Sequence, residues 1–197
     1  MTVTSQREVR TARPAPRERL LTTATRLFAA HGVHAVGIDR ILREAGVAKA
    51  SLYTTFGSKD DLVAAYVRTL DERDRERWAA AVAGQADPAA RVLTFFDLAL
   101  VGQEPHYRGC LYLSVASEYP EPATAGGRAV RAAVVAHREW FVTTIAGLLR
   151  HDGRAGAEEL ARQLRVLYDG ALAGAKLAHH DEPLRTARDL AAAMLAP

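Results

Sequence analysis

Residues 49–59 carry short polar and cationic side chains whose chemistry suits contact with nucleic acid. In the run that starts at Lys49, the apolar Leu52 and Phe56 stand four residues apart, so a helix would turn both of them inward. Hydroxyl and ammonium groups would face outward and donate hydrogen bonds to phosphate oxygens and base edges. The residues that we expect to contact DNA are Lys49, Ala50, Ser51, Tyr53, Thr54 and Lys59, with Gly37 and Arg40 upstream.

The preceding segment predicts how this helix is held. The apolar residues at helical spacing there are Ile38, Ile41, Leu42 and Ala45. Gly46 follows them, and glycine readily adopts the left-handed conformation with which many helices end. Helices over 38–45 and 49–55, joined by this turn, make a helix-turn-helix, whose second helix fits a DNA major groove. A helix-turn-helix used only for packing is the alternative interpretation.

Residues 17–66 resemble the DNA-binding domain of the TetR family of transcriptional regulators. The matching pieces are Leu-Phe-Ala-Ala-His-Gly at 27–32, Ile41, Ala45-Gly46-Val47, Leu52-Tyr53, Phe56, Lys59 and Leu62. The chain departs from the family at Val36 and Gly37, where many members carry Thr or Ser, and at Ala48, where Ser is usual. The resemblance implies a homodimer that binds a double-stranded, pseudo-palindromic operator, with a helical ligand-binding and dimerisation region behind the DNA-binding domain.

Composition predicts an all-α chain. Of its 197 residues, 49% are hydrophobic and 25% charged, and Ala and Leu dominate over β-branched runs. We expect a basic arm over 1–16, a DNA-binding domain over 17–66 and a ligand-binding and dimerisation domain over 67–197. Residues 1–62 hold ten Lys or Arg against six Asp or Glu, so the positive charge lies at the end that would meet phosphate. The arm either adds DNA contacts or is a solvated tail.

Several functional classes lack support in the sequence. No apolar run approaches the roughly 20 residues that span a bilayer, and no hydrophobic segment follows the N-terminal arginines as in a secretory signal. A single cysteine suits a reducing cytoplasm. Phosphate-binding glycine loops, nucleophile elbows and paired catalytic carboxylates are not found, so no enzyme activity and no cofactor are expected. The cluster His179-His180-Asp181 is better explained as the end of a helix than as a metal site.

The C-terminal region reads as a series of helices. The expected helices cover 59–83, 88–102, a short stretch within 108–120, 124–150, 155–180 and 183–196. The short helix starts with Gly109-Cys110 and ends with Glu118-Tyr119-Pro120, a combination similar to one branch of the TetR family, that of LmrA- and YxaF-like repressors.

The family resemblance implies a cavity among these helices for an aromatic or amphipathic small molecule. The expected lining residues are Trp78, Phe95, Phe96, Cys110, Tyr112, His137, Trp140, Phe141 and Tyr168. His137 either bonds a ligand or is a satisfied core histidine. Arg108 and His106 beside Cys110 could lower the pKa of its thiol and make it redox-active, although a buried structural cysteine is the commoner case.

The last two helices are expected to pair with a second copy of the chain, as they do in the family. The helix over 155–180 is apolar on two sides, and both sides need burial. The expected interface residues are Leu160, Leu164, Leu167, Ala171, Gly174, Ala178, Leu184, Leu190 and Met194. An intramolecular bundle would show the same pattern.

These observations predict a DNA-binding regulator that a small hydrophobic effector releases from its operator, most simply a repressor. Tyr53 and Lys59 are expected to bind phosphate. Two alternatives stay open: a ligand-binding or scaffold module without operator function, and a thiol-based redox sensor that acts through Cys110.

Overall fold

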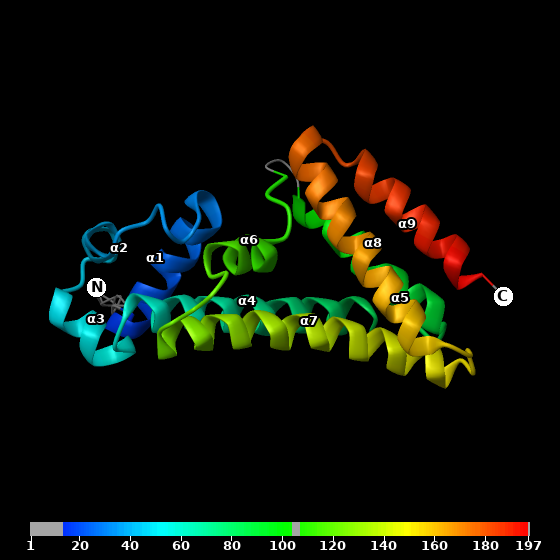
Figure 1. Ribbon diagram of the computed structural model, residues 1–197, viewed down its shortest axis with the longest axis horizontal. Helices are drawn as coiled ribbons and strands as arrows, with labels where there is room; N and C mark the ends of the chain where they lie inside the picture. The colour runs from blue at the N-terminus through cyan, green and yellow to red at the C-terminus, as the bar shows by residue number, and fades with distance from the viewer. Residues whose placement is uncertain (1–13, 104–106, 197) are drawn as a thin grey trace, which may run out of the picture.

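A computed structural model describes residues 14–103 and 107–196, and this part of the chain forms nine α-helices and no strand (Figure 1). The helices are α1 Pro16–His31, α2 Ile38–Ala45, α3 Lys49–Phe56, α4 Lys59–Ala81, α5 Pro88–Gln103, α6 Leu111–Glu118, α7 Ala125–His151, α8 Ala157–Ala178 and α9 Glu182–Leu195. The all-α prediction is confirmed, and the predicted bounds agree to within a few residues. Residues 1–13 of the predicted arm lie outside the described residues.

The three N-terminal helices fold as their apolar spacing predicts. Leu20, Leu27 and Phe28 give α1 one buried stripe. Helix α2 ends at Gly46, whose backbone is left-handed with φ 61° and ψ 43°, so the chain reverses without the strain that a side chain would bring. Leu52 then buries the inner face of α3. A helix-turn-helix results.

Two long helices connect the ends of the molecule. Helices α4 and α7 lie side by side along its long axis (Figure 1). Near their first turns the hydroxyl of Thr124 donates to Asp60, and further along the rings of Trp78 and Trp140 meet edge to face. Because α4 runs the whole way, it positions the helix-turn-helix relative to the C-terminal helices.

The described residues form two apolar cores. The first joins α1 to α4 with α6 and the start of α7, and the second joins α5, α8 and α9 with the rest of α7. Tyr112 and Val130 belong to the first core, although they lie far outside 17–66. The domain boundary at residue 66 therefore stays a prediction.

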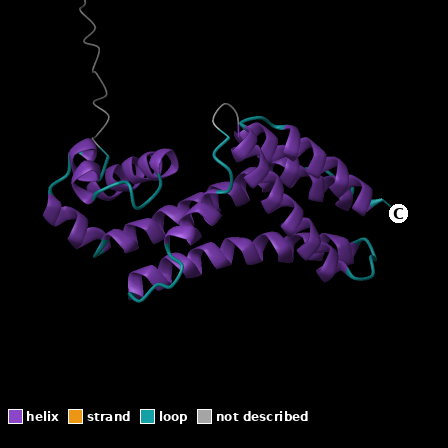
Figure 2. Ribbon diagram, turned by 45° about the horizontal axis from the view of Figure 1, so that its top comes forward, coloured by secondary structure: helices purple, strands orange, loops and turns teal. Residues whose placement is uncertain are grey.

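Figure 2 shows helices joined by loops throughout the described part of the chain, of which α7 and α4 are the two longest helices. Among the described residues, none of the helices combines the length and the apolar character that a bilayer crossing requires.

Candidate nucleic-acid interface and internal pocket

The outer face of α3 is polar and accessible. Lys49, Ala50 and Thr54 are exposed, and the Tyr53 side chain is 46% exposed although it is aromatic. Ser51 is half-buried. No carboxylate belongs to this helix, so nothing on it repels phosphate. The face has the shape and the donors that the sequence predicted for a DNA-reading helix.

An arginine from α1 braces the turn behind this face. Arg19 Nε donates to the carbonyl oxygen of Ala45 at 2.9 Å, and Arg19 Nη2 donates to the same oxygen and to that of Gly46. These carbonyls end α2 and have no partner inside the helix, so the guanidinium satisfies them. Sequence reasoning missed Arg19, because nothing in the spacing connects it to a turn 26 residues later.

Three predicted DNA-contacting residues also have partners within the chain. Lys59 Nζ donates to the Val33 carbonyl at 2.8 Å, and burial lowers the pKa of Lys59. Arg40 Nε donates to Glu44 at 2.9 Å, and Thr54 Oγ1 donates to its own helix at 2.9 Å. An ammonium has three donors and a guanidinium five, so phosphate contact would add to these bonds. Their DNA roles stay predictions.

The starts of α2 and α3 lack side-chain caps. Gly37 and Ala48 occupy the N-cap positions with extended backbones, and neither makes a side-chain hydrogen bond. Helix α4 differs, because the hydroxyl of Ser58 accepts from the N–H of Asp61 at 3.1 Å. Ser58 therefore caps α4, whereas the N-termini of α2 and α3 in the DNA-reading unit (helices α1 to α4) have no side-chain cap, and a phosphate there would accept from their first N–H groups.

Helix α6 and the loop after it are bonded directly to the DNA-reading unit. The Glu118 carboxylate accepts from the backbone N–H of Val33 at 2.9 Å and from that of His34. Tyr119 OH donates to Asp60 Oδ1 at 2.8 Å, and Thr124 Oγ1 donates to Asp60 Oδ2 at 2.9 Å. Movement of α6 would therefore displace both the α1–α2 loop and the start of α4. The sequence marked Glu118 only through a family resemblance, and it gave no sign of these bonds.

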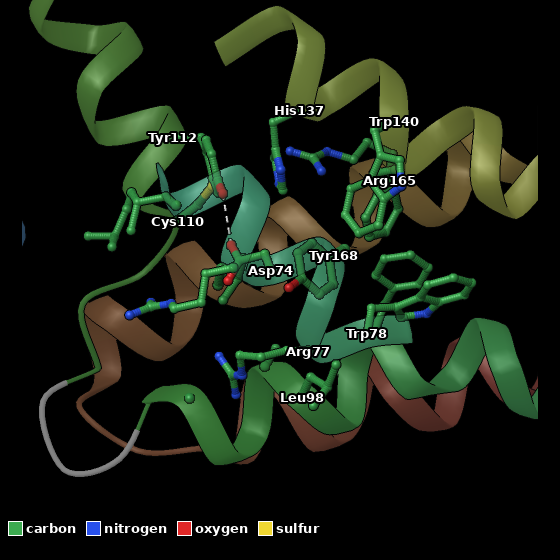
Figure 3. Close-up of a pocket in the computed structure, with 18 of the residues that line it drawn as sticks. Asp74, Arg77, Trp78, Leu98, Cys110, Tyr112, His137, Trp140, Arg165 and Tyr168 are labelled. Carbon is green, nitrogen blue, oxygen red and sulfur yellow. Dashed lines mark hydrogen bonds between the residues drawn. The ribbon is translucent and has the colours of Figure 1, made fainter. Parts of the chain in front are cut away.

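A partly open pocket with a volume of about 150 Å³, called the internal pocket below, lies between α4, α5, α6, α7 and α8 (Figure 3). Eight of the predicted residues line it: Trp78, Phe95, Cys110, Tyr112, His137, Trp140, Phe141 and Tyr168. The ninth, Phe96, does not. Its ring is fully buried and meets Tyr168 edge to face at 5.4 Å, so it packs behind the wall. The sequence did not predict four charged lining residues, namely Arg73, Asp74, Arg77 and Arg165.

His137 is both a lining residue and a satisfied buried histidine. Its Nδ1 lies 2.9 Å from Asp71 Oδ1, and its ring stacks on Tyr112 at 3.5 Å between centroids. Tyr112 OH in turn donates to Asp74 Oδ2 at 2.8 Å. Burial lowers the pKa of His137, although the bond to Asp71 opposes this shift. The two interpretations offered by the sequence are thus compatible.

Cys110 occupies the N-cap of α6, as expected, but its thiol is not activated. Burial raises the pKa of Cys110, and the charge of Arg165 opposes this only in part. Of the two alternatives, a lowered pKa is therefore contradicted and a buried structural cysteine agrees, because desolvation disfavours the thiolate more than the nearby cation stabilises it. His106, which the expectation also used, lies outside the described residues.

The predicted dimer residues divide between the inside and the outside of the chain. Leu164, Ala171 and Leu184 are buried in the chain's own second core, so they have no surface to offer a partner, and their assignment is corrected. The large apolar side chains exposed on α8 and α9 are Val166, Leu177 and the predicted interface residue Leu190, which are 73%, 86% and 51% exposed. The remaining predicted residues are half-buried (Leu160, Leu167, Gly174 and Met194) or exposed (Ala178).

The cluster His179-His180-Asp181, which the sequence predicted to be a helix end and not a metal site, follows α8. His179 is the C-cap residue of α8, with a left-handed φ of 56°, as the helix-end interpretation expects. Among the residues that the structure describes, no group of three or more His, Cys, Asp or Glu side chains is placed to hold a metal ion.

Comparison with known proteins gives consistent matches. A family model described as "Bacterial regulatory proteins, tetR family" matches residues 20–66. The chain is 36% identical over 80 residues to the transcriptional regulator LmrA of Bacillus subtilis, which is 40% of this chain and 43% of that one. It is 45% identical over 53 residues to YxaF of the same organism, which is 26% of this chain and 28% of that one. The matches span less than half of these two relatives.

A solved structure matches over nearly the whole length. SCO4454, a TetR-family transcriptional regulator from Streptomyces coelicolor, is 38% identical, with 91% of each chain covered and a TM-score of 0.76.

Proposed function

Because the chain belongs to the TetR family of transcriptional regulators, which are not enzymes, we propose that it is a homodimeric repressor that a small molecule releases from its operator. The observation that carries the DNA-binding part is the exposed polar face of α3, held outward by its buried Leu52 and by the brace from Arg19. The protein would act in the cytoplasm, with the DNA.

The outer faces of α8 and α9 support pairing with a second copy. Val166, Leu177 and Leu190 expose large apolar side chains on these two helices. Gly170 and Ala173 lie on the exposed side of α8 as well, and small residues allow helices to approach closely. Two copies joined through this surface would present two α3 helices. Successive major grooves on one side of B-DNA lie about 34–36 Å apart, which predicts the half-site spacing.

The internal pocket supports a response to a ligand. Its wall includes Tyr112 of α6, and the same helix ends at Glu118, which is bonded to the α1–α2 loop. A ligand that fits the pocket better in one position of α6 would shift the position of the DNA-reading helices. It would release the operator only to the extent that it prefers the released state.

Selection of bound duplexes from random DNA, followed by a gel shift at low ionic strength, tests the proposal. We expect a pseudo-palindromic sequence and one dimer bound per site. The matched control is the Lys49→Ala, Tyr53→Ala double variant, which removes two exposed side chains of α3 and should bind at least tenfold more weakly. A parent protein that ignores every duplex would instead favour the scaffold alternative.

A further inference from the structure

A guanidinium lies buried in the wall of the internal pocket. Arg165 of α8 is only 4% exposed and lines the cavity, with its guanidinium carbon 4.8 Å from the ring centroid of Phe141 and 5.9 Å from that of Tyr168 (Figure 3). Nη2 of Arg165 forms an ion pair with Asp169, whereas Nη1 has neither a hydrogen bond nor an ion pair to any residue that the structure describes. Buried polar groups are nearly always hydrogen-bonded, so Nη1 indicates a site for an acceptor.

The charge of Arg165 is only partly compensated within the chain. Asp169 Oδ2 accepts from Arg165 Nε at 3.2 Å, and Nη2 forms an ion pair with Oδ1 at 3.1 Å. The same carboxylate also accepts from Arg138 Nη2 at 2.7 Å. One negative charge thus serves two guanidiniums, and a positive charge remains at the pocket wall.

The other charged residues of the pocket add to this excess. Arg73 and Arg77 line the cavity and are exposed, whereas Asp74 is the carboxylate among the described lining residues. Asp74 already accepts a hydrogen bond from Tyr112 OH. Three cations against one anion among the lining residues favour an anionic guest. Arg165 contributes most, because water screens its buried charge poorly, whereas Arg73 and Arg77 are exposed and more strongly screened.

The remaining walls set the shape of the guest. The rings of Trp78, Phe95 and Trp140 meet one another within 6.2 Å and enclose the cavity beside Phe141. An apolar cavity of about 150 Å³ accommodates one benzene-sized ring in another protein. Aromatic walls of this kind prefer a flat, unsaturated guest.

We propose that the pocket binds a small aromatic carboxylic acid, with its carboxylate on Nη1 of the Arg165 guanidinium and its ring against Trp78, Phe95 and Trp140. A carboxylate accepts a hydrogen bond from a guanidinium more strongly than a neutral amide does, because the bond joins opposite charges. The proposal rests on the proposed function only for the consequence of binding, which would be release of DNA.

Three ring-matched probes test the charge preference: benzoate, benzamide and benzamidine, whose planar head groups are negative, neutral and positive. Binding to the full-length protein without DNA is measured by calorimetry or ligand-observed NMR. We expect benzoate to bind about tenfold more tightly than benzamide and benzamidine to bind most weakly. Benzamide binding as tightly as benzoate, or no benzoate binding at millimolar concentration, overturns the proposal.

Arg165→Met should abolish the preference for benzoate over benzamide, while Asp169 keeps its bond to Arg138. The matched control is Arg162→Met on the same helix, which removes an equal but exposed charge and should leave the preference unchanged. If Arg165→Met does not fold, Arg165→Lys takes its place, since it keeps the charge and loses the Nη1 donor, and it should weaken benzoate binding. An Arg165 variant that keeps the full preference overturns the proposal.

A gel shift on the selected operator separates this inference from the proposed function. Operator binding without benzoate binding would contradict this inference and leave the proposed regulatory function standing. Benzoate binding without any duplex binding would sink the proposed function alone.

Discussion

The carboxylate of Glu118 accepts the backbone N–H of Val33 at 2.9 Å, across 85 residues of sequence. This bond joins the end of α6, whose first turns line the pocket, to the loop between the first two helices of the DNA-reading unit. The two ends of α6 therefore contact the two candidate sites, and a rigid shift of this helix would connect them.

Replacing Glu118 with Ala should separate ligand binding from DNA release. The backbone N–H groups of Val33 and His34 would lose a charged acceptor, which costs about 2 kcal/mol of unfolding free energy. Ligand affinity should stay near that of the parent, because Glu118 is not a lining residue. Denaturant unfolding and operator release by ligand measure the two effects. Glu121→Ala, at an exposed position nearby, is the control.

Lys49→Ala should lower the salt dependence of operator binding without changing stability. Its ammonium is exposed on α3, and each lost phosphate contact lowers the slope of log K against log salt by about one unit. Lys59→Ala should lower both the slope and the unfolding free energy, because Lys59 also donates to Val33. An unchanged slope in either variant would contradict the phosphate role of that lysine.

Leu177→Arg should yield a monomer. The side chain is 86% exposed on α8, so the change leaves the chain's own core intact and places a charge in the proposed interface. Sedimentation would show the loss of the dimer, and operator affinity should fall with it. Val101→Arg, at a 76% exposed position on α5, is the control and should remain dimeric.

Ala48→Ser should stabilise the protein by about 1 kcal/mol. Ala48 sits at the N-cap of α3 with φ −68° and ψ 148°, which suits a capping serine, and it makes no cap of its own. Thermal unfolding measures the gain. A change that lowers the melting temperature would show that this N-terminus is already satisfied in another way.

Stability should fall as the pH drops below about 6.5, and His137 should account for part of the fall. Burial holds the pKa of His137 below its ordinary value, so the unfolded chain binds a proton that the folded chain refuses. Protonation therefore favours unfolding, and stability recovers as the pH rises through this range. Denaturation of His137→Gln should show a weaker pH dependence than the parent, whereas exposed His151→Gln should match the parent.

Local spacing predicted the elements well and their contacts only in part. Ile41, Leu42 and Leu52 face inward as their period requires, because the direction of a side chain follows from its place on its own helix. The period does not say which neighbour covers a helix that is apolar on two sides. Leu164 and Leu184 were therefore assigned to a partner although the chain's own core buries them.

The charged residues of both sites were harder to foresee. Arg19 and Glu118 bond to residues that are distant in the sequence. Arg165 is buried only because the assembled helices cover it. The packing around Cys110 opposes the activation that its neighbours in sequence could have brought, and it favours the commoner alternative, a buried structural cysteine.

Helix α4 belongs to both apolar cores, with Tyr66 in the first and Trp78 packed against the second. The two halves of the molecule should for this reason melt in a single calorimetric transition. A chimaera that joins the DNA-reading unit to another sensor domain should therefore include α6 and the first turns of α7. A fragment that ends at residue 66 would expose the apolar side chains that α6 and α7 cover in the full chain, and it should aggregate.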